Sequence, residues 1–310
     1  MLFSVVVPVF NRENLIGRCI ASVLAERNVE FELVLVDDGS TDASLACMRE
    51  FDDPRLRIIA EERNRGASPA RNIAIDAARG DWVVSLDSDD ELAPGALGRI
   101  ASLAAGQPDD IDALWFRCRM DDGQVSPGRL TAMQEWDYAG FVGFWQATVG
   151  EWRDMLYCSR RRCHDVLRQP AGRMDEAKYL LDFAKRFRIR AYPDVLRLYH
   201  QDADNQLVDR LRRLDPLRDR DIVLDRAACF RDLLREHGAF VARQAPKLYR
   251  DYLESAATTA TMANLRGEAL ARAGELVRLA PGRSRSWVLL GASLMGLPAV
   301  HLRRWMTRQR

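Results

Sequence analysis

Cysteines are few and widely spaced in this sequence of 310 residues. None of the six belongs to a C-x-x-C pair, so the sequence shows no zinc-binding pattern and no sign of a disulfide framework. Scattered single cysteines in a chain of this length are typical of buried thiols in a reducing compartment. The six are Cys19, Cys47, Cys118, Cys158, Cys163 and Cys229.

Excess charge and long apolar runs are also missing. The formal net charge is +1, which argues against nucleic acid as a partner. The apolar opening from Met1 to Phe10 follows no basic segment and is interrupted by Pro8, so it does not resemble a signal peptide. The longest apolar run, Trp287 to Leu297, is shorter than the roughly 20 residues that span a bilayer. We therefore expect a cytoplasmic protein, with contact to the inner face of the membrane left open.

What the first ninety residues do contain is an alternation of buried strands and amphipathic helices. Asn11 can cap a helix that runs to Leu24, a second helix follows Asp42, and a third runs from Pro69 to Ala78 and ends at Gly80. The alternation predicts an α/β fold whose mostly parallel sheet has helices on both faces. The expected strands are Ser4–Pro8, Phe31–Val36, Leu56–Ile59 and Trp82–Leu86.

The remaining chain divides near residue 215. Up to that point strands and a helix alternate less regularly, and beyond it the pattern is helical throughout, with Pro281 and Gly282 ending the last clear helix. We predict a domain over 1–215 and a helical region over 216–310. The later elements expected are strands at Ala113–Phe116, Met155–Cys158, Ile189–Tyr192 and Leu196–His200, and helices at Met174–Arg186, Arg220–His237, Phe240–Ala263 and Glu268–Leu279.

Three polar clusters each follow a predicted strand: Pro8–Asn11, Asp37–Asp42 and Asp87–Asp90. In open α/β sheets ligands bind at the carboxyl ends of the strands, so one site can gather all three clusters. In the third cluster Asp87, Asp89 and Asp90 repel one another unless a cation lies between them. Mn²⁺ or Mg²⁺ is the cation that such oxygen ligands favour. A solvated turn that caps the next helix is the alternative.

Asp38 and Arg71 also have two interpretations each. Asp38 lies in a stretch that can be a tight turn, or its carboxylate can accept a hydrogen bond from a nucleobase. Arg71 can be a surface residue of a helix, or its guanidinium can pair with phosphate or with an acidic neighbour.

Taken together, these motifs resemble the family 2 glycosyltransferases, an inverting group with the GT-A fold. The resemblance is strong over about the first hundred residues and weaker up to about 205, and it implies a nucleotide-binding half at 1–100 and an acceptor half at 101–215. The matching stretches are Val5–Asn11, Leu35–Asp42, Asn64–Gly66 with Ala70–Asn72, and Leu86–Asp90.

The resemblance implies a donor and a set of binding residues. The donor would be a nucleoside diphosphate sugar, commonly a UDP-sugar, and the acceptor a saccharide or lipid-linked saccharide in surface polysaccharide assembly. A metal would help the diphosphate to depart. The implied nucleotide-sugar ligands are Pro8, Val9, Phe10, Asn11, Asp38, Arg71, Asp87, Ser88 and Asp89, and the implied metal ligands are Asp89, Asp90 and His200.

The catalytic base is where this sequence departs from the family. Relatives carry Glu-Asp at a helix start, whereas this chain has Asp175 followed by Glu176. Counting back from Pro193, Glu176 falls where the family Asp is expected, and Asp182 and Asp175 are the alternatives. The acidic pair can also simply favour a helix N-terminus.

Two further segments have open interpretations. An aromatic stretch can be core packing or a platform for the acceptor sugar. The tail, 287–310, can lie on an anionic membrane or pack on the enzyme or on a second subunit, which would give a homodimer. The aromatic residues are Trp136, Tyr138, Phe141, Phe144, Trp145 and Trp152.

Two competing functions follow from the same residues. A sugar-nucleotidyltransferase would have a glycine-rich phosphate loop after the first strand, where this chain has Pro8 to Arg12. A non-catalytic module that binds a sugar nucleotide or a partner would account for the reversed order of Asp175 and Glu176.

Overall fold

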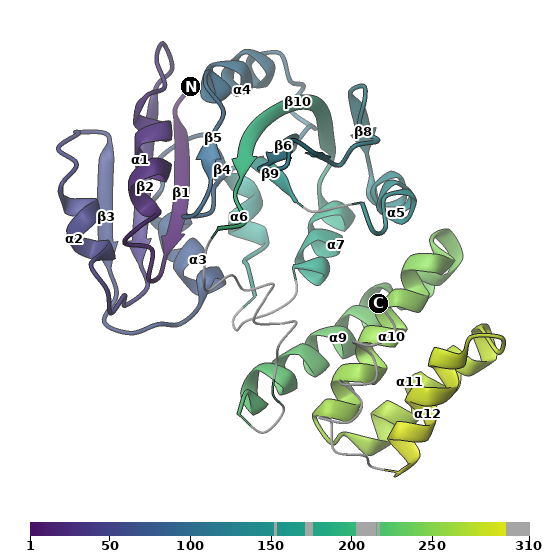
Figure 1. Ribbon diagram of the computed structural model, residues 1–310. Helices are drawn as coiled ribbons and strands as arrows, with labels where there is room; N and C mark the ends of the chain where they lie inside the picture. The colour runs from purple at the N-terminus through teal and green to yellow at the C-terminus, as the bar shows by residue number, and fades with distance from the viewer. Residues whose placement is uncertain (152–153, 171–175, 203–214, 216–217, 296–310) are drawn as a thin grey trace. The chain divides into compact units, whose positions relative to one another are not determined.

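The described residues of the computed structural model are 1–151, 154–170, 176–202, 215 and 218–295, and the chain forms two compact units (Figure 1). The first unit comprises Met1–Phe144, Thr148–Gly172 and Asp182–Asp204, and the second comprises Trp145–Ala147, Arg173–Leu181 and Asn205–Arg310. The predicted division at residue 215, between a domain over 1–215 and a helical region over 216–310, stays a prediction.

One ten-stranded sheet forms the centre of the first unit (Figure 1). Its main order is β3-β2-β1-β4-β9-β6-β10-β5, with β7 paired to β6 and β8 to β10. Strands β3, β2, β1 and β4 are parallel, β9 is antiparallel to both β4 and β6, and β10 is parallel to β6. The strands are β1 (Phe3–Val9), β2 (Phe31–Asp37), β3 (Leu56–Ala60), β4 (Trp82–Ser85), β5 (Glu91–Leu92), β6 (Ala113–Met120), β7 (Val125–Ser126), β8 (Gln134–Trp136), β9 (Met155–Arg160) and β10 (Ile189–Tyr199).

Helices accompany the sheet and make up the second unit (Figure 1). Those that begin in the sequence before residue 200 are α1 (Ile16–Leu24), α2 (Ser44–Arg49), α3 (Ala67–Ala77), α4 (Ala96–Ala105), α5 (Tyr138–Ala147), α6 (Arg162–Val166) and α7 (Ala177–Arg186). Those that follow are α9 (Arg220–Gln244), α10 (Pro246–Met262), α11 (Arg266–Leu279) and α12 (Ser284–Met295). The predicted α/β class with a mostly parallel sheet and C-terminal helices is confirmed.

Successive side chains of a strand point to opposite faces of the sheet, and in this sheet apolar clusters cover both faces. In β1, Val5 and Val7 belong to the large core cluster that includes residues of α1, α2 and α4. Val6 belongs to a second cluster with Ala70 and Ala74 of α3. The continuous apolar run seen in the sequence therefore serves two cores, one on each face.

Three predicted boundaries were wrong. Asn11 does not cap α1, which begins at Ile16; its side chain accepts a hydrogen bond from the backbone N–H of Thr41 instead. The strand expected to end at Tyr192 continues through Pro193 to Tyr199. The helix expected from Phe240 does not begin there, because α9 extends to Gln244 and α10 starts at Pro246, which cannot supply the N–H that a continuing helix needs.

Within the described residues, none of the helices combines the length and the apolar character that crossing a bilayer requires. Residues 296–310 of the predicted tail lie outside the described residues, as does Trp152.

Gly80, which precedes β4, provides a test of how closely the chain packs against the start of β1. A Cβ at this position would lie 2.7 Å from the backbone nitrogen of Ser4, whereas a Cβ at Gly98 in α4 would meet nothing within 4 Å. We expect Gly80→Ala to lower the free energy of unfolding by about 1–3 kcal/mol through overpacking. Gly98→Ala, the matched control, should raise it by up to about 1 kcal/mol through helix propensity. Urea denaturation measures both, and equal effects would contradict the packing described for Gly80.

Candidate active site

Loops after β1, β2 and β4 meet at the carboxyl edge of the sheet, as parallel pairing requires. Asn11, after β1, donates its backbone N–H to Ser40 Oγ (3.0 Å) and accepts from the N–H of Thr41 through Oδ1 (2.8 Å). Arg12 reaches the third loop, with Nη2 3.4 Å from Asp89 Oδ2. The structure therefore brings together the three polar clusters that the sequence placed at strand ends.

Asp37 and Asp38 are both 2% exposed but differ in their partners. The carboxylate of Asp38 accepts the backbone N–H groups of Arg65 (2.9 Å) and Gly66 (2.7 Å), which ties the start of α3 to the end of β2. Burial raises the pKa of Asp38, and these two hydrogen bonds oppose the rise. Asp37 Oδ1 has no hydrogen-bond partner among the described residues. A buried carboxylate oxygen without a partner is costly, and a ligand N–H could satisfy it.

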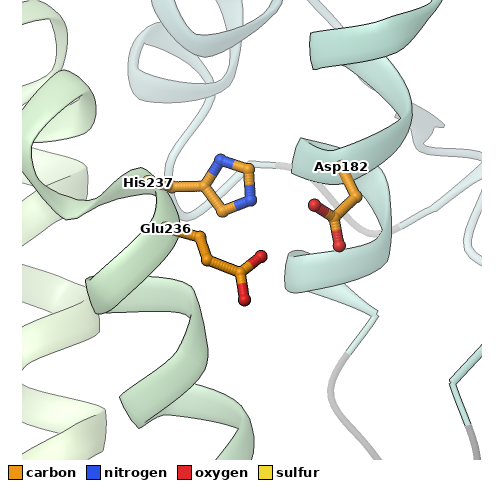
Figure 2. A group of neighbouring side chains, drawn as sticks. All are labelled: Asp182, Glu236 and His237. Carbon is orange, nitrogen blue, oxygen red and sulfur yellow. The ribbon is translucent and has the colours of Figure 1, made fainter.

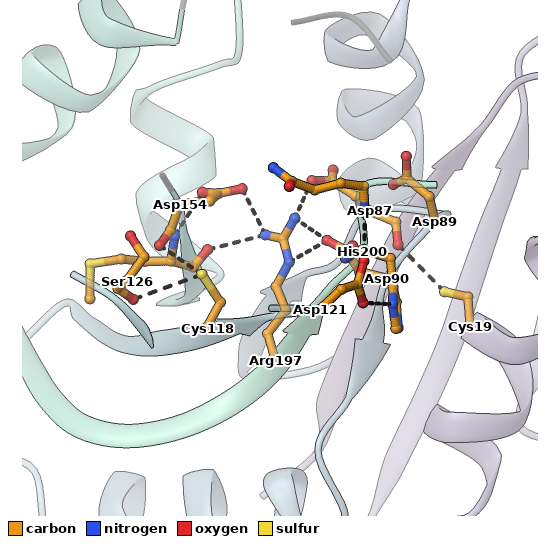
Figure 3. A network of polar contacts seen from close by, with 12 residues as sticks. Cys19, Asp87, Asp89, Asp90, Cys118, Asp121, Ser126, Asp154, Arg197 and His200 are labelled. Atoms are coloured by element: carbon orange, nitrogen blue, oxygen red, sulfur yellow. Dashed lines mark hydrogen bonds and ion pairs between the residues drawn. The ribbon is translucent and has the colours of Figure 1, made fainter. Parts of the chain in front are cut away.

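Arg197, on β10, is the centre of the acidic cluster and is 2% exposed (Figure 3). Its Nε donates to Asp90 Oδ2 and its Nη2 to Asp87 Oδ2, each at 2.6 Å. Nη1 lies 3.0 Å from Asp154 Oδ2, on the other side of the guanidinium. One buried cation thus binds three carboxylates from the β4 loop and the start of β9.

Asp87 and Asp89 have different partners within this cluster. Arg71 of α3, 6% exposed, donates to Asp87 Oδ1 at 2.6 Å, and its other terminal nitrogen donates to Gln169. Asp89 lies beside the Arg197 group (Figure 3), and its ion pair is the longer one to Arg12. Asp89 is consequently the cluster carboxylate that is held least tightly.

The protonation behaviour of the cluster reflects buried negative charge. Burial raises the pKa of Asp90 to about 7; Asp87 and Asp89 add to the rise and Arg197 opposes it. Burial, together with the charge of Asp87, also raises the pKa of Asp89. At Asp87 burial acts in the same direction, but Arg197 and Arg71 outweigh it and the pKa falls. An added cation near Asp89 would relieve this charge, so the oxygen ligands present fit Mg²⁺ or Mn²⁺.

Residues 200–202 directly follow β10 and contribute contacts that fix the acidic loop, Asp87–Asp90. The backbone N–H of His200 donates to Asp90 Oδ1 (2.8 Å). The ring nitrogens of His200 lie 2.6 Å from Asp121 and 2.9 Å from Glu91. A metal-ligand role for His200 would therefore require one of these contacts to be exchanged.

Arg18 of α1 links the same segment to Asp89. Its Nε and Nη2 donate to the backbone oxygen of Asp89 (3.2 and 2.6 Å), and its guanidinium binds the carboxylate of Asp202 (2.6 and 2.7 Å). The backbone of Asp89 is thus fixed while its carboxylate stays loosely held.

Two of the three candidate bases, Glu176 and Asp182, are described, the first directly before α7 and the second within it. Asp182 is 9% exposed and forms an ion pair with Arg186 at 3.2 Å. Figure 2 draws Asp182 on α7 and, on α9 of the second unit, Glu236 and His237. Glu176, just before α7, is exposed, and Asp175 lies outside the described residues.

The aromatic stretch is largely a packed cluster in the first unit. Trp115 of β6 contacts Trp136, Phe141 and Tyr157 edge to face, with ring centroids 5.0–6.2 Å apart. Trp136 is 2% exposed and Phe141 is fully buried, so core packing accounts for both. Trp145 belongs to the second unit, where it contacts Tyr252.

The remaining predicted nucleotide-sugar ligands lie at the end of β1 and in the acidic loop. Val9 is 1% exposed and its side chain lies in the large core cluster, whereas Phe10 and Asn11 are half-buried. Pro8 is buried in β1, and Ser88 is 6% exposed.

Sequence reasoning missed Arg197, Asp154 and the open oxygen of Asp37. Arg197 lies within a segment predicted as an ordinary strand and Asp154 directly precedes another, and their long separation from Asp87 in the sequence hides the pairing. A single arginine in an otherwise apolar strand was the available signal, since a charge is buried only with partners.

The chain was compared with known proteins. Residues 4–149 match the family model described as glycosyl transferase family 2. A relative, the succinoglycan biosynthesis protein ExoO of Rhizobium meliloti, is 46% identical over 111 residues, which are 35% of this chain and 32% of that protein. The aligned segment thus spans about a third of the length of that relative.

Two solved structures share the fold. S. aureus TarS 1–349 in complex with UDP-GlcNAc has a TM-score of 0.63 at 17% identity, covering 98% of this chain and 90% of that chain. The mannosyltransferase PcManGT from Pyrobaculum calidifontis, in complex with GDP-Man and Mn²⁺, has a TM-score of 0.55 at 18% identity, covering 98% and 87%. The strand-end motifs, the GT-A fold and the match of residues 4–149 to the glycosyl transferase family 2 model agree with one another.

Proposed function

We propose that this chain is a metal-dependent, inverting glycosyltransferase that moves a hexosyl or hexosaminyl group from a nucleoside diphosphate sugar to a hydroxyl group. A UDP-sugar is the donor we would test first, and a saccharide or lipid-linked saccharide in polysaccharide or glycolipid assembly is the acceptor. The observation that carries the proposal is the loosely held carboxylate of Asp89 within a buried acidic cluster, at the ligand-binding edge of a family 2 chain.

Asp89 is the proposed ligand of Mn²⁺ or Mg²⁺. Its contact with Arg12, at 3.4 Å, is longer than a strong charge-assisted hydrogen bond, so exchange for a cation costs little. Asp90 already accepts hydrogen bonds from Arg197 and from the backbone of His200. We therefore consider Asp90 and His200 weaker candidates for metal ligands than Asp89. When bound, a divalent cation supplies positive charge that stabilises the departing diphosphate.

The nucleotide is proposed to bind across the ends of β1 and β2. Asp37 Oδ1 and the adjacent Asp38 offer acceptors for a base N–H, and the open oxygen of Asp37 makes it the stronger candidate. Phe10 and Asn11 supply half-buried side chains after β1. Arg71 keeps Asp87 ionised and adds a cation beside the diphosphate.

The acceptor hydroxyl must lose a proton during transfer, and Glu176 is the proposed base. Its side chain is exposed, so an acceptor can approach it, whereas Asp182 is only 9% exposed. A single displacement by that hydroxyl inverts the configuration at the anomeric carbon.

Donor binding is the first prediction of this function. A ligand that binds the native state raises the melting temperature by mass action, and at 100 times Kd the gain is about 2.7 kcal/mol, or about 5–10 °C for a domain of this size. We expect that shift with one nucleoside diphosphate in the presence of Mn²⁺, a smaller shift without the metal, and loss of the metal effect in Asp89→Asn. Asp194→Asn, whose partner is Arg99 on α4, is the matched control.

Failure to bind any nucleotide would contradict the proposal and favour a partner module. A shift with a nucleoside triphosphate, together with release of pyrophosphate only when a sugar 1-phosphate is added, would indicate a nucleotidyltransferase instead.

The base assignment gives a second prediction. Glu176→Gln should lower kcat by about 10²–10⁴-fold, the usual contribution of a general base, while the nucleotide-induced melting shift is retained. Asp182→Asn should have a much smaller effect on kcat. Donor turnover with each variant measures this, and the reverse order of effects would move the base to Asp182.

Arg197 gives a third prediction. Arg197→Met leaves Asp87, Asp90 and Asp154 without their common cation. Asp87 keeps its ion pair with Arg71, but Asp90 and Asp154 lose theirs, and breaking a buried ion pair in this way costs about 3–5 kcal/mol. Arg99→Met, which breaks a half-exposed ion pair, should cost less than about 1 kcal/mol. Urea unfolding of both variants measures the difference, and similar losses would show that the buried cluster does not depend on Arg197.

A further inference from the structure

Arg12, in the loop after β1, lies between the two ends of the proposed donor site. Its Nη1 donates to the backbone oxygens of Phe10 (3.4 Å) and Asn11 (3.2 Å), and its Nη2 lies 3.4 Å from Asp89 Oδ2. Phe10 and Asn11 belong to the proposed base-binding end, and Asp89 is the proposed metal ligand. Because the guanidinium contacts all three residues, a nucleoside diphosphate that joins the two ends passes directly beside it.

The backbone of Arg12 is fixed, whereas its contact with Asp89 is long. Its backbone N–H donates to Ser44 Oγ at 2.6 Å, and its backbone oxygen accepts the N–H groups of Leu15 and Ile16 at 2.9 Å each, where α1 begins. A strong charge-assisted hydrogen bond between nitrogen and oxygen measures about 2.7–2.9 Å, and the contact with Asp89 is longer at 3.4 Å. Exchanging Asp89 for another anionic partner therefore breaks no short hydrogen bond between the two residues.

Arg12 and a divalent cation compete for the same carboxylate. The side chains of Arg12 and Asp89 are only 12% and 15% exposed, so solvent screens their charges incompletely. Arg18 binds the backbone oxygen of Asp89, which keeps that residue in the acidic loop. A metal ion that binds Asp89 without a nucleotide therefore displaces the guanidinium and stays close to a second positive charge.

We propose that Arg12 is a diphosphate-binding residue that couples metal binding to donor binding. It is paired with Asp89 in this structure, and it pairs with the donor diphosphate once a metal ion binds Asp89. Guanidinium groups bind phosphate oxygens through paired N–H donors. Metal alone leaves Arg12 without an anion, and diphosphate alone leaves Asp89 without a cation, so each ligand strengthens binding of the other. This inference rests on the proposed function, since it assigns a role within that donor site.

The affinity for Mn²⁺ without nucleotide is the first test. Arg12→Gln removes the charge but keeps an N–H donor for the backbone oxygens of Phe10 and Asn11. We expect this variant to bind Mn²⁺ about fivefold more tightly than the native chain, the factor that release from a weak ion pair supplies. Arg12→Lys keeps the charge and should stay within about twofold of the native chain. Electron paramagnetic resonance of free Mn²⁺ measures both, with Arg99→Met as the control that should change nothing.

Binding of the diphosphate should change in the opposite direction. At saturating Mn²⁺, titration calorimetry with UDP and with GDP should show that Arg12→Gln binds the preferred nucleotide about tenfold more weakly, the usual loss of one hydrogen bond to a charged group. A merely structural defect would weaken Mn²⁺ and nucleotide together. Tighter metal binding with weaker nucleotide binding is therefore the signature of the proposed coupling.

A second variant keeps the test decisive if Arg12→Gln melts early without ligands. Asp89→Asn releases Arg12, so its affinity for the preferred nucleotide without Mn²⁺ should rise by about threefold. Unchanged Mn²⁺ affinity in a folded Arg12→Gln variant, or unchanged nucleotide affinity in either variant, would overturn this inference while the donor site stands. A native chain that binds neither Mn²⁺ nor nucleotide would overturn the proposed function as well.

Discussion

The site depends on one buried cation. Arg197, itself buried, holds Asp87, Asp90 and Asp154 close together, where carboxylates repel each other and are costly to keep charged. Because Arg197 is part of β10, the position of the acidic loop is set by the sheet itself. His200 and Asp202, further along the same segment, extend this control to the backbone of Asp90 and, through Arg18, of Asp89.

This arrangement separates two tasks within a short acidic motif. Asp87 and Asp90 are used mainly to build the loop, since their oxygens are taken up by Arg71, Arg197 and His200. Asp89 has its backbone fixed by Arg18 but keeps a carboxylate with one long ion pair. A rigid backbone with an available carboxylate is what a preorganised metal ligand needs.

Local patterns in the sequence predicted the strands and helices well where burial is continuous, as in Phe3–Val9 and Phe31–Asp37. They also placed the three polar loops on one edge, because parallel pairing leaves no other arrangement. They failed where a tertiary contact decides the outcome: Asn11 pairs with Thr41 rather than capping a helix. Arg197 could not be assigned for the same reason, since its partners are distant in sequence and come together only when the sheet forms.

The place of β10 in the sheet has a consequence for synthesis of the chain. β10 pairs with β6 on one side and with β5 and β8 on the other, so it is an interior strand although it is the last of the described strands to be made. Arg197 follows Asp87 by 110 residues, which a ribosome takes roughly 5–20 s to add. During that interval the acidic loop has been made without its main counter-charge, and the sheet must stay open between β5 and β6. Until its final strand inserts, the nascent sheet therefore exposes unpaired strand edges, which are the surfaces most prone to aggregation.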